Sequence, residues 1–343
     1  MAKCVLNNGK VIGDGESLFF VAEVNSSHNG DLNVAKQMAS KIKEIGADAI
    51  KFQSWSSKTL YSKDYYKENP ISKRFFDKFS FDDNKFNEML KYCNDIGLLF
   101  ASTPYSNDEV DYLVNVAKVP FIKIASMDIN NYLFLEYIAK TGSAIILSTG
   151  MSTYDEVDKA IEILKLSGNK NLCVLHCVSL YPVEYSDINL NNILYLKEKY
   201  KDIPIGFSDH SIGYEVPAAA IALGACMIEK HFTLDKSKIG MDNQMATEPG
   251  EFKNMIDACK NVYNALGSKN RIVLEEEKEQ LKKMRRSIVS KCELHKGDVI
   301  KLEDIDFKRP ADGISPDRYK EVIGKKLKVD KAEDAIIYDI DLD

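Results

Sequence analysis

The chain of 343 residues is 45% hydrophobic and 29% charged, which excludes collagen-like, coiled-coil and disordered proteins. Its 46 Lys and Arg residues and 52 Asp and Glu residues give a net charge of −6, so nucleic acid and anionic membranes are poor partners. At roughly 150 residues per domain the length suits about two domains, although one barrel could use most of it.

The sequence predicts neither a membrane anchor nor a disulfide framework. The longest nearly apolar run, 216–228, contains Pro217 and Gly224 and is shorter than the roughly 18 residues that span a bilayer. The N-terminus lacks the charged stretch, apolar core and cleavage site of a secretory signal. The seven Cys residues form no C-x-x-C pair, so no structural zinc site is expected. We therefore expect a cytoplasmic protein.

Short apolar strands alternate with amphipathic helices along most of the chain. The pattern predicts strands at 18–24, 49–53, 98–102, 121–124, 144–148, 172–176, 204–207 and 226–229. It predicts helices at 32–45, 82–96, 106–116, 132–141, 153–166, 189–200, 214–223 and 249–266. Strands this short and apolar, alternating with helices, imply a parallel sheet that is buried on both faces.

Eight strand–helix units in about 250 residues are typical of a (β/α)8 TIM barrel. The alternative is an open doubly wound sheet, but no Gly-rich turn of the kind that sheet usually carries follows Val24. Beyond the barrel, EEEKEQLKKMRR predicts a solvated helix, and short apolar pieces separated by Gly and Pro follow it. We predict a barrel domain at 1–270, a linker helix at 271–286 and a small, mostly β domain at 287–343, whose core is marginal alone.

Polar side chains end all eight predicted strands, where barrel enzymes place their active sites. In strand order they are Glu23 and Asn25; Lys51 and Gln53; Ser102 and Thr103; Lys123 and Ser126; Ser148 and Thr149; His176, Ser179 and Tyr181; Ser208, Asp209 and His210; and Glu229, Lys230 and His231. Loops are polar in any protein, but Lys, His and Glu inside strand ends are unexpected because burying an unpaired charge is expensive.

Two of these histidines suggest a metal site. Side chains two residues apart share a face of a strand, so Ser208 pairs with His210 and Glu229 pairs with His231 on neighbouring strands. Two imidazoles with nearby carboxylates suit a catalytic divalent metal. The alternative, that each His is a core or surface residue, stays open on the pattern alone.

Two lysines suggest an anion pocket. Lys51 and Lys123 would form a ring of cations and hydroxyl donors with four further side chains: Thr103, Ser126, Ser148 and Ser208. Such a ring fits a small, highly charged anion such as a phosphate ester with a carboxylate. The alternative is a pair of lysines that extend their ammonium groups to solvent.

Eight motifs in this order resemble the sialic acid synthase family. They are AEVNSSHNGD at 22–31, IKFQ at 50–53, STPYS at 102–106, IKIAS at 122–126, LSTGM at 147–151, LHCVSLYP at 175–182, GFSDHS at 206–211 and IEKHFTLD at 228–235. The tail resembles the antifreeze-like (SAF) domain of that family, so the resemblance covers essentially the whole chain.

The resemblance implies a transferase that condenses phosphoenolpyruvate with the aldehyde of an open-chain N-acyl hexosamine, N-acetylmannosamine or a close relative. The products would be a nine-carbon 2-keto acid and phosphate, which leaves by C–O cleavage after water adds to the former enol carbon. A divalent metal, Mn²⁺ or Mg²⁺, would polarise the aldehyde. Relatives that make legionaminic or pseudaminic acid suggest an alternative acceptor, a 2,4-diacetamido-2,4,6-trideoxyhexose.

The resemblance also implies roles for single residues. The catalytic set would be Glu23, Lys51, Lys123, His210 and His231, of which the two histidines would bind the metal. The phosphoenolpyruvate pocket would be Lys51, Thr103, Lys123, Ser126, Ser148, Ser179 and Ser208. The sugar would contact Gln53, Tyr181, Asp242 and Arg309.

Three features qualify these roles. Ser179 stands where family members that use N-acetylmannosamine often have Asn, and Met241 replaces the Pro of a G-P-D loop. Arg309, next to Pro310, matches an arginine that reaches the partner subunit's site, which implies a domain-swapped homodimer.

Two alternatives to this predicted function stay open. They are another metal-dependent barrel enzyme, such as an aldolase or epimerase, and a non-catalytic binding protein that acts through its SAF module.

Overall fold

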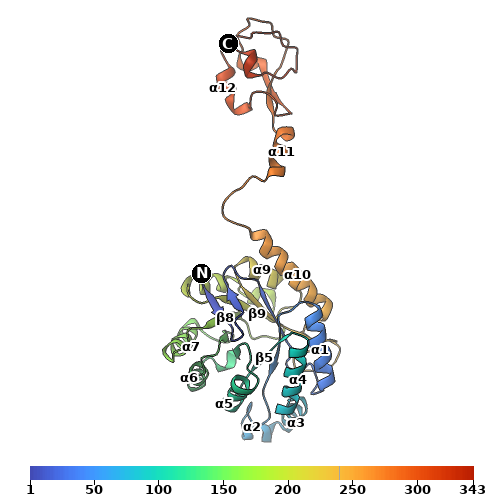
Figure 1. Cartoon of the computed structure of the whole chain (residues 1–343), viewed down its shortest axis with the longest axis vertical. Coiled ribbons are helices and arrows are strands. Elements are labelled where there is room, and N and C mark those ends of the chain that lie inside the picture. Colours follow the sequence, from blue (N-terminus) through green and yellow to red (C-terminus); the bar gives the residue numbers. More distant parts are fainter. Residues whose placement is uncertain (239) are drawn as a thin grey trace. The chain divides into compact units, whose positions relative to one another are not determined.

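The computed structural model describes residues 1–238 and 240–343, which form two compact units, Met1–Gly267 and Ser268–Asp343 (Figure 1). No described helix is long and apolar enough to cross a membrane.

The first unit is a closed barrel of eight parallel strands, as the sequence predicts, so the open doubly wound alternative is wrong. In chain order the strands are β3 (Phe19–Glu23), β4 (Ala49–Gln53), β5 (Leu99–Thr103), β6 (Ile122–Ile124), β7 (Ile145–Ser148), β8 (Leu172–Cys177), β9 (Ile205–Asp209) and β10 (Met227–His231). The barrel closes where β10 pairs with β3, with His231 opposite Glu23. Closure therefore brings the ends of the first and last barrel strands together, although they lie far apart in the sequence.

Helices surround the strands (Figure 1). They are α1 (Leu32–Glu44), α2 (Lys63–Glu68), α3 (Pro70–Phe79), α4 (Asp83–Asp95), α5 (Asn107–Asp111), the π-helical η1 (Tyr112–Val116), α6 (Tyr132–Lys140), α7 (Tyr154–Leu166), α8 (Asn191–Lys199), α9 (Glu215–Ala222) and α10 (Pro249–Leu266). Short 3₁₀ turns are η2 (Ser126–Asp128) and η3 (Tyr185–Asp187). Local capping fixes several starts: the Asp31 carboxylate accepts from Asn33 N at the start of α1, and Thr153 with Glu156 forms a capping box at α7.

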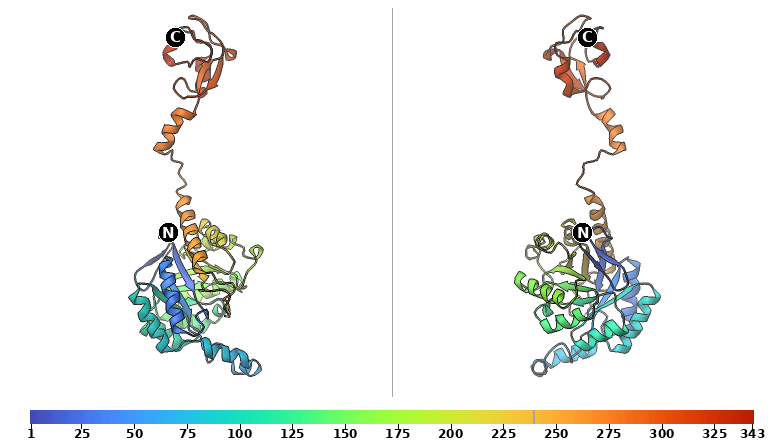
Figure 2. Two further views of the ribbon diagram at one scale, coloured as in Figure 1. Left: turned by 90° about the vertical axis from the view of Figure 1, so that its right-hand side faces the viewer. Right: turned by 60° about the vertical axis from the view of Figure 1, so that its left-hand side comes forward.

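Two elements of this unit lie outside the sequence prediction. A hairpin of β1 (Lys3–Val5) and β2 (Val11–Gly13) buries Cys4, Leu6 and Ile12 against residues at the N-terminal ends of the barrel strands. Helices α2 and α3 extend from the barrel as an arm (Figure 2) and pack their aromatic side chains around Trp55. The hairpin covers apolar surface of the barrel that would otherwise face water.

The interior of the barrel changes from apolar to polar along each strand. On β3 the alternation of side chains points Phe19 and Val21 into a buried apolar layer, and Glu23 comes next on the same face. On β4 the same alternation carries Ala49 in the apolar layer and then Lys51. The apolar layer supports a polar layer at the C-terminal ends of the strands, where the site lies.

The second unit is small and mostly β, as predicted. Helix α11 (Glu275–Met284) buries no side chain and precedes an antiparallel pair, β11 (Ser287–Ser290) and β12 (Ile305–Lys308). The remaining elements are η4 (Leu302–Asp304), η5 (Pro316–Arg318), α12 (Tyr319–Val322) and η6 (Asp339–Asp341). Its core consists of Ile288, Leu294, Ile300, Ile305, Ile314, Val322, Leu327 and Ile337.

Candidate active site

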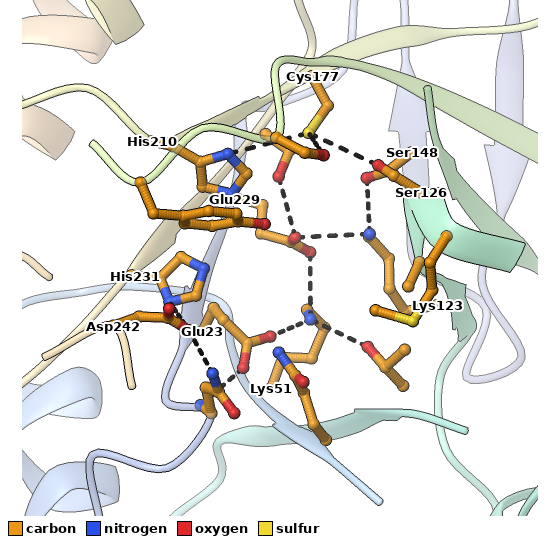
Figure 3. A pocket seen from close by; sticks show the side chains of 18 of the residues that line it. Glu23, Lys51, Lys123, Ser126, Ser148, Cys177, His210, Glu229, His231 and Asp242 are labelled. Atoms are coloured by element: carbon orange, nitrogen blue, oxygen red, sulfur yellow. Dashed lines mark hydrogen bonds and ion pairs between the residues drawn. The ribbon is translucent and has the colours of Figure 1, made fainter. Parts of the chain in front are cut away.

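A cavity of about 290 Å³ opens at the C-terminal ends of the barrel strands (Figure 3). Every barrel residue to which the sequence assigns a role lines it: Glu23, Lys51, Gln53, Thr103, Lys123, Ser126, Ser148, Ser179, Tyr181, Ser208, His210, His231 and Asp242. The strand-end rule and the alternation of side chains therefore select residues that do lie together.

Lys51 is the most densely paired cation of the cavity. Its ammonium group contacts Glu23 Oε2, donates to Thr103 Oγ1 at 3.1 Å and lies 3.7 Å from Glu229 Oε2. Burial alone would lower the pKa of Lys51, but the carboxylates of Glu229 and Glu23 raise it above its usual value. Lys51 is therefore a permanent cation, and it does not extend its ammonium group to solvent.

Lys123 approaches the same carboxylate from the opposite side. It donates to Ser148 Oγ at 2.6 Å, and its ammonium nitrogen lies 3.5 Å from Glu229 Oε1. Burial lowers the pKa of Lys123 despite Glu229. Glu229, which also accepts from Ser208 Oγ at 3.2 Å, thus bridges the two lysines (Figure 3).

The two buried carboxylates have opposite electrostatic environments. Burial raises the pKa of Glu23. Burial acts on Glu229 too, but Lys123 and Lys51 hold its pKa below the usual range. Glu229 is therefore a fixed anion, whereas the raised pKa of Glu23 makes it the carboxylate that takes up a proton more readily, as a general acid or base must.

The imidazoles of His210 and His231 are neighbours with ring centroids 5.4 Å apart. His210 Nδ1 lies 2.7 Å from the Val178 carbonyl oxygen, to which it donates, so the lone pair is on Nε2. Burial, followed by the charge of His210, lowers the pKa of His231 well below its usual value, so His231 is neutral. Asp242 Oδ2 lies 3.7 Å from His231 Nδ1.

This donor set fits a divalent metal with open coordination positions. Cys177 and the Val178 carbonyl raise the pKa of His210 despite its burial, so a metal ion would bind there in place of a proton. Imidazole nitrogens suit Mn²⁺ and related ions, and such catalytic sites leave room for water or substrate. Among residues 1–238 and 240–343, no three His, Cys, Asp or Glu side chains gather as a complete metal site. His210 and His231 could hold a metal if water or substrate oxygens filled its remaining positions.

Gln53 and Asp242 are oriented by their neighbours. Gln53 Oε1 accepts from Trp55 Nε1 at 3.0 Å and from Tyr105 Oη at 2.8 Å, so its amide N–H groups are left for a ligand. The Asp242 carboxylate accepts from the Asn25 side chain, which ties the loop after β10 to the end of β3. Both side chains are held in place before any sugar binds.

Comparison with known proteins identifies the family. The NeuB family model matches residues 38–271, and the SAF domain model matches residues 285–343. The chain belongs to the NeuB family. It is an enzyme, a transferase that forms a carbon–carbon bond.

Three full-length relatives and one solved structure illustrate the similarity. The chain is 41% identical to an uncharacterized protein of Methanocaldococcus jannaschii, with 97% of each chain covered. It is 35% identical to the N,N'-diacetyllegionaminic acid synthase of Campylobacter jejuni (92% of this chain, 98% of the relative). It is 32% identical to human N-acetylneuraminate-9-phosphate synthase (96% and 94%). The N-acetylneuraminic acid synthetase structure from Leptospira borgpetersenii superposes with a TM-score of 0.74 at 34% identity, covering 81% of this chain and 95% of that one.

Several pocket residues of this NeuB-family chain had no role in the sequence prediction. Glu229 is the most important, and its alternation with His231 was the available signal. The others are Asn25, Tyr105, Met127, Met151, Cys177 and Met241. Met127 lies in η2, whereas Met151 and Met241 lie in loops after strand ends. Of the three, only Met241 was marked by the sequence, as the residue in place of the Pro of a G-P-D loop.

Other strand-end residues point away from the cavity. His176 Nε2 lies 2.7 Å from the Ile188 carbonyl oxygen, and the ring stacks on Phe207, so His176 belongs to the outer core. The hydroxyl groups of Ser102 and Ser54 form a hydrogen bond of 2.6 Å outside the pocket.

Arg309 is an exposed residue of the second unit, in a surface hollow it shares with Arg286 and Lys308.

Proposed function

We propose that this enzyme condenses phosphoenolpyruvate with the open-chain aldehyde of an N-acyl hexosamine, N-acetylmannosamine or a close relative. The products are a nine-carbon 2-keto acid of the sialic acid type and phosphate. The observation that carries the proposal is the floor of the cavity, where Lys51 and Lys123 share Glu229 directly beside two imidazoles. Cations at the floor and imidazole ligands beside them suit one anionic and one carbonyl substrate.

Phosphoenolpyruvate binds at the floor in this proposal. Lys51 and Lys123 pair with its anionic oxygens, and hydroxyl donors supply the remaining hydrogen bonds: Thr103, Ser126, Ser148, Ser179 and Ser208. Glu23 and Glu229 already neutralise the positive charges of the two lysines. Protonation of Glu23 removes one of these negative charges, so that the lysines can pair with the anionic substrate instead. The raised pKa of Glu23 supports that role.

The reaction forms one carbon–carbon bond and breaks one carbon–oxygen bond. The enol carbon of phosphoenolpyruvate attacks the aldehyde carbon, and the aldehyde oxygen takes up a proton. Water then adds to the former enol C2, giving up a proton, and the C2–O bond breaks to release phosphate and leave the keto group. Glu23 holds or moves the proton of that water.

A divalent metal, Mn²⁺ or Mg²⁺, is part of the proposal. His210 and His231 hold it, and when bound it polarises the aldehyde as a Lewis acid. The free Nε2 of His210 and the neutral ring of His231 support this assignment. Val178 fixes the His210 ring through its carbonyl group, as outer partners of metal ligands do.

The acceptor sugar lies above the floor, against Gln53, Tyr181 and Asp242. The free amide N–H of Gln53 suits an acyl or hydroxyl oxygen, and the Asp242 carboxylate suits a hydroxyl donor. Arg309 reaches this site from the partner subunit of a domain-swapped homodimer, where it donates to the acyl oxygen. The exposure of Arg309 on its own unit supports a partner outside that unit.

A second acceptor, a 2,4-diacetamido-2,4,6-trideoxyhexose, is favoured by the rim of the cavity. Met127, Met151 and Met241 line it and are 55%, 69% and 49% exposed. Thioether surface suits the 6-methyl group of a deoxy sugar better than a hydroxymethyl or phosphate group. Ser179 and Met241 are also the positions at which the chain departs from N-acetylmannosamine users.

The test is phosphate release by the full-length protein with Mn²⁺, phosphoenolpyruvate and a panel of aldoses. The panel is N-acetylmannosamine, its 6-phosphate, 2,4-diacetamido-2,4,6-trideoxymannose and the altrose analogue. We expect release only when phosphoenolpyruvate and one aldose are both present, which an aldolase or epimerase would not require. Release without an aldose, or none with any aldose, would contradict the proposal.

A further inference from the structure

Asp209 and Lys230 form a buried ion pair that the proposed chemistry does not use. They are register partners on β9 and β10, and they are 0% and 2% exposed. Asp209 directly precedes His210, and Lys230 directly precedes His231. Because successive side chains point to opposite faces of a strand, the pair lies on the outer face of the barrel behind the two imidazoles.

Ser211 completes a closed hydrogen-bonded network with this pair. Its backbone N and its Oγ both donate to Asp209 Oδ1, at 2.9 and 2.8 Å. Lys230 Nζ contacts Asp209 Oδ2 and donates to the Ser211 carbonyl oxygen at 2.6 Å. The turn that carries His210 is thus tied at both of its ends to β10, the strand that carries His231.

Stability alone does not account for this pair. Moving two charges out of water costs several kcal/mol per ion, and an apolar pair of similar volume is often as stable or more stable. A buried ion pair with a closed network does, however, allow only one arrangement of its backbone. Apolar side chains at these two positions would allow the strand ends to shift.

We propose that Asp209, Lys230 and Ser211 are positioning residues that fix the separation of His210 and His231. The network sets the 5.4 Å distance between the two rings from behind, while the Val178 carbonyl sets the rotation of the His210 ring. The inference rests on the proposed function, since it takes the two imidazoles as metal ligands.

The test measures Mn²⁺ binding to the full-length protein by isothermal titration calorimetry, without substrates. The double variant Asp209→Leu/Lys230→Met removes both charges and leaves neither ion unpaired. We expect it to melt near the wild-type temperature but to bind Mn²⁺ about tenfold or more weakly, the usual effect of losing partners behind a metal ligand. The single variant Lys230→Arg keeps the positive charge beside Asp209 and should therefore bind Mn²⁺ more tightly than the double variant does.

A matched control removes an ion pair elsewhere on the barrel unit. Lys197 Nζ lies 2.9 Å from Asp14 Oδ1, next to the N-terminal hairpin and away from the cavity. Asp14→Leu/Lys197→Met should bind Mn²⁺ as the wild type does. An equal loss of affinity in this control would mean that any disturbance of the barrel weakens binding, and it would overturn the positioning role.

Other outcomes are equally decisive. Wild-type Mn²⁺ affinity in the folded double variant overturns the inference. If that variant does not fold, Ser211→Ala removes one hydrogen bond and should weaken Mn²⁺ binding several-fold; wild-type affinity there overturns the inference instead. A wild-type protein that binds no Mn²⁺ overturns the metal proposal and this inference together, whereas unaffected variants overturn only this one.

Discussion

Lys123 tests the anion pocket because its removal leaves two buried carboxylates facing one ammonium group. Lys123→Met keeps the aliphatic volume and deletes the group that donates to Ser148 Oγ at 2.6 Å and lies 3.5 Å from Glu229 Oε1. A hydrogen bond from a charged group contributes about 1.5 to 3 kcal/mol, and about 1.4 kcal/mol is a factor of ten. We therefore expect the KM for phosphoenolpyruvate to rise about 10- to 100-fold.

The assay is steady-state phosphate release, with each substrate varied while the other is saturating. The KM for the acceptor should change by less than about threefold, because Lys123 lies at the floor and contacts no sugar in the proposal. Lys140→Met is the matched control, since Lys140 on α6 is exposed and pairs only with Glu136 among the described residues. Equal rises in both KM values, or an unchanged KM for phosphoenolpyruvate, would refute the pocket.

Three further predictions follow from the site and the core. His210→Ala or His231→Ala should lower turnover by about 100-fold or more, roughly 3 kcal/mol of lost charge stabilisation; near-normal turnover of both variants in chelator would contradict it. Burial lowers the pKa of His28 to about 4, from 6.5. The unfolded state therefore takes up the proton first, so stability falls by about 3 kcal/mol as the pH drops through that interval; His28→Asn should flatten this slope in urea melts, and an unchanged slope would be evidence against it. Arg309→Ala should raise the acceptor KM by an amount worth about 1.5 to 3 kcal/mol and leave the KM for phosphoenolpyruvate nearly unchanged. Mixing inactive His231→Ala subunits with Arg309→Ala subunits should restore activity if the arginine acts in trans, because one site of the mixed dimer then carries neither change; no recovery despite subunit exchange would contradict the swap.

The barrel could be predicted because its strands are short apolar runs that alternate with helices. The strand predicted at 18–24 forms at Phe19–Glu23, and that at 49–53 forms as expected. The hairpin of β1 and β2 could not be predicted in the same way, since each strand has three residues and its burial depends on the barrel it closes. Helices α2 and α3 likewise depend on aromatic packing around Trp55 rather than on a clear helical repeat.

The site could be predicted in part because the C-terminal ends of the barrel strands converge, regardless of the loops that follow them. Alternation puts Glu23 and Lys51 on the inner face, the register of β3 and β4 places them side by side, and closure of the barrel then adds His231. The bridging position of Glu229 was not predictable, because it depends on how far two lysines from β4 and β6 reach across the barrel. The outward direction of Lys230 followed from alternation, but its partner could be identified only from the register of β9 and β10.

The most direct test of the account follows one oxygen atom. Phosphoenolpyruvate labelled with ¹⁸O at the bridging C–O–P position is incubated with the enzyme, Mn²⁺ and the best aldose of the panel, and the released phosphate is analysed by mass spectrometry. Condensation with C–O cleavage predicts that the label leaves with phosphate and that a nine-carbon 2-keto acid forms in equal amount. Unlabelled phosphate, with the label retained in the keto acid, would contradict the account.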